Sequence, residues 1–131
     1  FLWKLFGDVA LRVLFVSGCS SALAGRLADL IDSLDTPDTL YGISSNMTGL
    51  AAPRECTSQM QRILDLLTAQ QGANHAPLLE SYRKKQVSPC GITSLEAMRR
   101  TGILKGSYRV LAQRMSPVNG GRRTGYAGCI G

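Results

Sequence analysis

The residues best suited to metal or redox chemistry are four cysteines, Cys19, Cys56, Cys90 and Cys129, and the single histidine, His75. Structural zinc sites bring their ligands in close pairs, whereas these cysteines lie 37, 34 and 39 positions apart. We therefore expect no metal site. Cys90 and Cys129 lie in loop-like surroundings where one disulfide could fasten the C-terminal segment, and four free thiols are the alternative.

Residues for covalent catalysis are also scarce. A nucleophilic serine or cysteine needs a base that a third group holds in place, and nothing in the spacing brings His75 to such a partner. Glu96 follows Thr93 at the spacing of a capping box, so we interpret it as a cap of its own helix and not as a catalytic acid. The sequence therefore predicts a protein that is not an enzyme and that uses no cofactor.

Charge gives the clearest indication of a partner. The chain of 131 residues has a net charge of +6, with 15 Lys+Arg against 9 Asp+Glu. Residues 1–80 hold 5 basic and 8 acidic side chains, a net of −3, while residues 81–131 hold 10 basic side chains and one acidic, a net of +9. The basic half either neutralises the acidic half or docks on anionic lipid, RNA or an acidic neighbouring subunit. The basic residues expected at such a surface are Arg83, Lys84, Lys85, Arg99, Arg100, Arg109, Arg122 and Arg123.

The N-terminal region is apolar over most of its length. Apolar residues at steps of three and four predict a helix over residues 2–34, with Gly18 and the serines around it as a bend or interruption. Either the domain covers this helix itself, or a groove in a larger assembly or a membrane interface does so. We favour protein contact, because the polar stripe of the helix is only weakly basic. The apolar side chains expected to anchor that contact are Phe1, Trp3, Phe6 and Leu14.

The remaining patterns predict a mainly α fold, a small helical domain of three to four helices. Helices are expected over residues 53–71 and 77–85, and a short one from about residue 93 to Gly102. Residues 1–106 form the helical domain in this interpretation. Residues 107–131 form either a β-hairpin about the turn at Asn119-Gly120-Gly121 or an extended basic tail. No uncharged stretch reaches the roughly 18 residues of a membrane span.

Together these features favour a non-catalytic accessory subunit that stabilises a larger complex through other protein subunits. The first residue is Phe1 and not Met, so we expect either a processed chain, as import into a chloroplast or mitochondrion would produce, or a segment whose start is missing. A photosynthetic or respiratory membrane complex, with this subunit at its periphery, fits the moderate Lys+Arg content better than a ribosome. The alternative is an RNA-contacting protein of an organellar ribosome, with residues 81–131 on the RNA.

Overall fold

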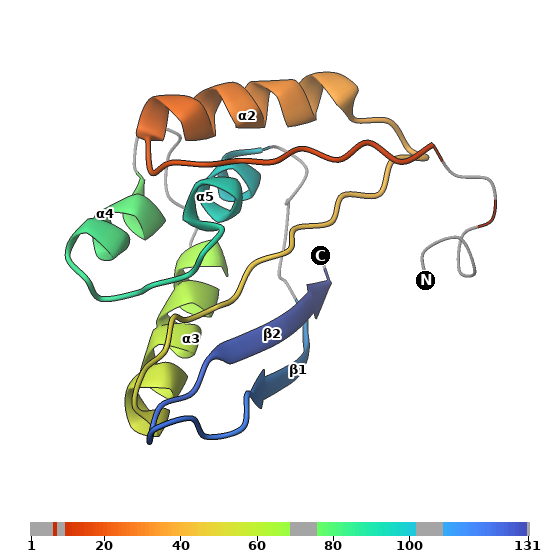
Figure 1. The fold of residues 1–131 in the computed structure, drawn as a ribbon. Coiled ribbons are helices and arrows are strands. Elements are labelled where there is room, and N and C mark those ends of the chain that lie inside the picture. The colour runs from red at the N-terminus through yellow and green to blue at the C-terminus, as the bar shows by residue number, and fades with distance from the viewer. Residues whose placement is uncertain (1–6, 8–9, 69–75, 102–108, 131) are drawn as a thin grey trace.

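The computed structural model describes residues 7, 10–68, 76–101 and 109–130, which form four helices and a β-hairpin (Figure 1). The mainly α prediction is confirmed, and the C-terminal segment is a hairpin and not an extended tail. In chain order the elements are α2 (Ser21–Leu34), α3 (Pro53–Thr68), α4 (Pro77–Arg83), α5 (Ile92–Arg100), β1 (Arg109–Met115) and β2 (Gly125–Ile130).

The helices pack around α5, which contacts α2, α3 and α4. Figure 1 shows α2 lying across one end of the molecule, with α3 and the hairpin at the other. The small side chains of Ala24 and Ala28 are buried on α2, which lets the backbones of α2 and α5 approach closely. On the far side of α5, α3 contributes Met60 and Ile63 to the buried core.

Helix α3 forms where its sequence pattern predicts. Pro53 occupies the first helical position, where its fixed φ suits a helix and its missing N–H leaves no donor unpaired. Cys56, Met60, Ile63 and Leu64 recur at helical spacing and are all buried. The apolar stripe therefore faces the core, as expected.

The predicted helix over residues 2–34 is wrong for residues 10–20, which are extended, while α2 begins only at Ser21. The Oγ of Ser20 caps α2 by accepting the N–H of Leu23 at 3.3 Å, and such a cap marks a helix start. Gly18 has a φ of +95°, a conformation that interrupts a helix. The β-branched Val13 and Val16 upstream also favour extended backbone.

The hairpin is antiparallel, with Arg114 opposite Tyr126 and a bulge between Val110 and Ala112. Its turn contains Gly120 and Gly121, whose positive φ values of 55° and 77° match the type I′ turn that a tight hairpin requires. The predicted turn is therefore confirmed.

Residues 47–51 join the hairpin to the helices. Met47 N–H donates to the Gly125 carbonyl at 2.9 Å, and the Oγ1 of buried Thr48 accepts the Gly125 N–H at 2.8 Å. Ala51 and Arg123 exchange two backbone hydrogen bonds of 2.9 and 2.8 Å. The start of β2 is thus hydrogen-bonded to residues 47–51, and β2 lies against α3.

Gly125 of the hairpin packs directly against side chains of α3. A Cβ at this position would lie 2.5 Å from Met60 Sδ and 2.9 Å from Cys56 Sγ, inside a filled core. Gly125→Ala is expected to lower the free energy of unfolding by about 1–3 kcal/mol through overpacking. Urea denaturation measures this change.

Gly42→Ala is the matched control, because a Cβ at Gly42 would meet no described atom within 4 Å. Its effect is expected to stay within about 0.5 kcal/mol. Equal effects of the two substitutions would contradict the packing of β2 on α3.

Candidate functional site

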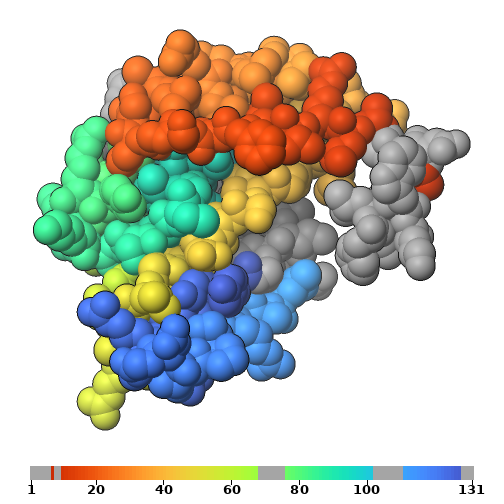
Figure 2. Space-filling model, viewed as in Figure 1, coloured from red at the N-terminus to blue at the C-terminus, as the bar shows by residue number. Residues whose placement is uncertain are grey.

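Several exposed apolar side chains lie close together in the segment from Leu11 to Phe15, which we call the apolar segment. Leu11 and Val13 are each 62% exposed, and Phe15 is 97% exposed. Figure 2 shows residues 10–20 lying on the surface alongside α2. The segment therefore presents several neighbouring apolar side chains to solvent.

The predicted anchor Leu14 lies in this segment and is 59% exposed. The other three predicted anchors, Phe1, Trp3 and Phe6, lie outside the described residues. Leu11, Val13 and Phe15 were not among the predicted anchors. An alternating pattern could not have identified them, because Leu14 and Val16 make the run apolar at successive positions.

The chain just after the apolar segment is attached firmly to α5. Thr93, which is 2% exposed, donates its hydroxyl to the Gly18 carbonyl at 2.6 Å. Arg100 donates from Nη1 to the Ser21 carbonyl at 3.0 Å and from Nη2 to Ser21 Oγ at 2.8 Å. These hydrogen bonds therefore fix the position at which the apolar segment joins the helices.

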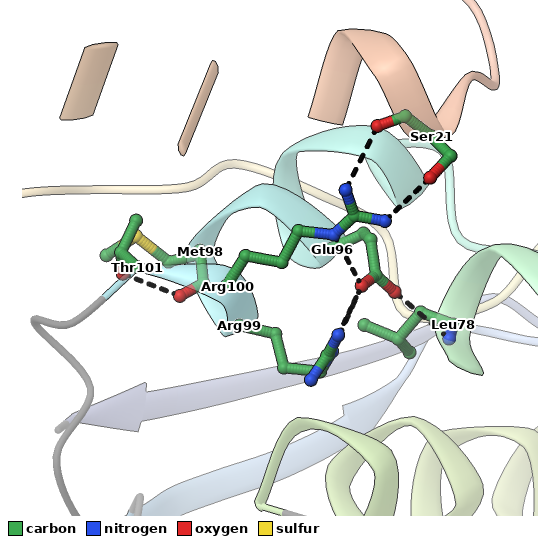
Figure 3. Close-up of polar contacts among 7 residues, drawn as sticks. All are labelled: Ser21, Leu78, Glu96, Met98, Arg99, Arg100 and Thr101. Atoms are coloured by element: carbon green, nitrogen blue, oxygen red, sulfur yellow. Dashed lines mark hydrogen bonds and ion pairs between the residues drawn. The ribbon is translucent and has the colours of Figure 1, made fainter. Parts of the chain in front are cut away.

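Arg100 belongs to a buried charge cluster around Glu96 (Figure 3). The Glu96 side chain is fully buried, and its Oε1 accepts from Arg99 Nη2 at 2.7 Å and from Arg100 Nε at 3.1 Å. Its Oε2 accepts the backbone N–H of Leu78 at 3.1 Å. One carboxylate thus joins α5 to α4 and, through Arg100, to α2.

The predicted capping box at Thr93 and Glu96 is therefore wrong. Helix α5 has Gly91 at its N-cap and no side-chain cap, and Glu96 instead satisfies a donor in the first turn of α4. Burial explains the difference, because a carboxylate inside the core is stabilised only by partners that are buried with it. Two arginines and the end of a neighbouring helix supply those partners.

The predicted basic surface divides into separate sets. Arg99 and Arg100, with side chains 3% and 12% exposed, are engaged inside the domain and are removed from that surface. The other predicted basic residues are Arg83, Lys84 and Lys85 at the exposed end of α4, exposed Arg122 and partly buried Arg123 beside the hairpin turn, and Arg109 in β1. Figure 2 shows α4 and the hairpin at different places on the same face.

Cys90 of the predicted disulfide is a free thiol in the structure, and the side chain of its predicted partner Cys129 lies outside the described part of the chain. The Cys90 side chain lies at the surface. Its Sγ accepts the N–H of Asn46 at 3.1 Å, so the sulfur is turned toward residues 45–46. Cys129 lies in β2, opposite Val110. Cys56 is fully buried on α3, and its Sγ lies 3.1 Å from Thr48 Oγ1.

Within the described ranges, no group of three or more His, Cys, Asp or Glu side chains is placed to hold a metal ion. His75 lies outside those ranges. None of the helices in the described part of the chain has the length and hydropathy that a membrane crossing needs.

Glu96→Gln would remove the buried negative charge that Arg99 Nη2 and Arg100 Nε both contact. Glu96→Gln is therefore expected to lower the free energy of unfolding by about 3 kcal/mol, the low end for a broken buried pair because Arg100 keeps some access to water. Thermal and urea denaturation followed by far-UV circular dichroism measure the change.

Asp38→Asn, which neutralises an exposed carboxylate in the loop after α2, is the control and is expected to change stability by no more than about 0.5 kcal/mol. A Glu96→Gln variant as stable as this control would show that the cluster does not hold the helices together.

No family model, curated protein or solved structure matches this chain. Its function must therefore be inferred from the chemistry of its own surface. That chemistry consists of the exposed apolar segment and two separate exposed sets of cations.

Proposed function

We propose that this protein is a non-catalytic accessory subunit that stabilises a larger multi-subunit complex through protein contacts. The single observation that carries the proposal is the exposure of the apolar segment, with Phe15 97% accessible. Isolated apolar residues are common on protein surfaces, but several of them close together in one extended segment are typical of an interaction site.

The energetics support binding through this segment. Burying one large apolar side chain contributes about 1.5–3 kcal/mol, so Leu11, Val13 and Phe15 together offer several kcal/mol to a partner that covers them. Extended segments dock by adding a strand to a sheet edge or by filling an apolar groove. Both modes can bury apolar side chains such as those that this segment exposes.

The kind of complex and the organelle that contains it are a further part of the proposal. We propose a photosynthetic or respiratory membrane complex in a chloroplast or mitochondrion, with this subunit at its periphery. The acidic first 80 residues and the 15 Lys+Arg in 131 residues suit such a complex better than the RNA-rich interior of a ribosome.

One observation favours a second candidate, an RNA-contacting protein of an organellar ribosome. Arg114 lies opposite Tyr126 on the hairpin, both are exposed, and exposed Arg122 is nearby at the turn. An aromatic ring beside guanidiniums on a sheet can stack on unpaired bases. Steeply salt-dependent RNA binding that Arg114→Gln and Tyr126→Ala abolish would favour this candidate.

The accessory-subunit proposal is tested by replacing Leu11, Val13 and Phe15 together with serine in the full-length protein. All three side chains are exposed, so the fold is expected to survive. In native-gel fractionation of organelle extracts, the unchanged protein is expected to migrate with a large complex and the triple variant as the free chain. Fluorescent tagging of the same proteins tests the proposed organelle.

Leu50→Ser is the matched control, because Leu50 is 57% exposed but lies outside the apolar segment. It is expected to stay with the complex. Migration of the unchanged protein as a free monomer, or equal retention of the triple variant, would overturn the proposal.

A further inference from the structure

The exposed end of α4 carries a compact group of cations on rigid backbone. Helix α4 ends with two paired hydrogen bonds, from Gln86 N–H to the Ser81 carbonyl and from Lys85 N–H to the Tyr82 carbonyl, both 2.9 Å long. This is the Schellman arrangement, which fixes the residue after the helix cap in the left-handed conformation. Arg83, Lys84 and Lys85 are all exposed at this end.

Lys85 is the residue held in that conformation, with a φ of +56°. Of all the described residues other than glycine, it alone has a positive φ. Glycine is favoured at this place because a Cβ is strained there. The chain thus has a lysine where glycine would be more stable, and strained backbone that persists in a fold often marks a functional position.

The backbone around Lys85 is supported on both sides. Gln86 Oε1 accepts from Arg62 Nη2 at 2.8 Å, and Arg62 Nε donates to Ser81 Oγ at 3.4 Å. Val87 follows and is 1% exposed. A surface ordered in this way before binding loses less conformational entropy when a partner docks.

We call Arg62, Arg83, Lys84 and Lys85 the basic knob. The exposed carboxylates closest to it in sequence are Glu80 on α4 and Asp65 on α3, so the four cations outnumber these acids. An excess of fixed positive charge favours an anionic partner.

Exposed aspartates elsewhere on the molecule restrict the size of that partner. Asp29, Asp32, Asp35 and Asp38 are exposed toward and beyond the C-terminal end of α2, whereas α4 lies on the side where α2 begins (Figure 1). A long nucleic acid or an anionic bilayer spread over the molecule would meet these aspartates, while a short acidic segment would contact only the knob.

We propose that the basic knob docks a short segment rich in Asp and Glu from a neighbouring protein subunit. This inference rests on the proposed accessory role and names the chemistry of one partner. The apolar segment and the knob are then two separate contacts, one apolar and one electrostatic.

The test is binding of a fluorescent oligo-glutamate peptide to the purified full chain, measured by anisotropy at low salt. Lys84→Gln and Lys85→Gly are each expected to weaken peptide binding about threefold, as expected for one surface charge. Lys85→Gly is also expected to raise the melting temperature by about 3 °C, because it relieves the left-handed strain. Weaker binding by a more stable protein is a result that misfolding cannot produce.

The double variant Arg114→Gln/Arg122→Gln removes two charges from the hairpin and serves as the control for Lys84→Gln/Lys85→Gly. It is expected to bind the peptide as the unchanged protein does. Equal loss in both double variants, or tighter binding of oligo-uridylate or anionic vesicles through the knob, would overturn the inference. The assay uses the isolated chain, so its outcome is independent of whether the protein migrates with a complex.

Discussion

The buried carboxylate of Glu96 is the interaction on which the arrangement of the helices depends. It binds two arginines on its own helix and the first turn of α4, and Arg100 then reaches Ser21 at the start of α2. A charge in the core is stable only when its partners are held in place, so the cluster penalises any other packing of these three helices. The orientation of α4, and with it the basic knob, follows from this constraint, as does the point from which the apolar segment leaves the domain.

The core beneath this cluster is small, which explains why so much apolar surface stays outside. The helices meet through alanines on α2 and through Met60, Ile63, Leu78 and Leu79, and the hairpin closes one end through Gly125. A two-stranded hairpin is marginal by itself, so it relies on its bonds to residues 47–51 and on α3. Nothing in this packing covers Leu11, Val13 or Phe15.

Local patterns predicted α3 and α4, and offered the hairpin as one of two alternatives, because the determining signals lie within each element: a proline at the helix start, an apolar stripe, and a turn with two glycines. The failures came where one pattern allowed two structures. Residues 10–16 are apolar at helical spacing, but the helix begins only after the cap at Ser20. Glu96 had capping-box spacing, but its partner Leu78 lies 18 positions away, so no local rule could identify the contact. For the same reason, counting charges along the sequence could not distinguish buried cations from exposed ones. Arg99 and Arg100 pair with Glu96 in the core, whereas Lys84 and Lys85 are exposed.

That separation matters for function, because a cation is available to a partner only if the fold does not already use it. Arg99 and Arg100 balance Glu96, whereas Lys84 and Lys85 extend into solvent from backbone that the Schellman bonds hold rigid. Lys85 keeps the isolated domain less stable than glycine at that position would make it, and the apolar segment leaves apolar area in contact with water. Such features persist most readily when a partner covers the apolar segment and neutralises the charge of Lys85. In the function that we propose, the apolar segment and the basic knob are the two surfaces that contact neighbouring subunits.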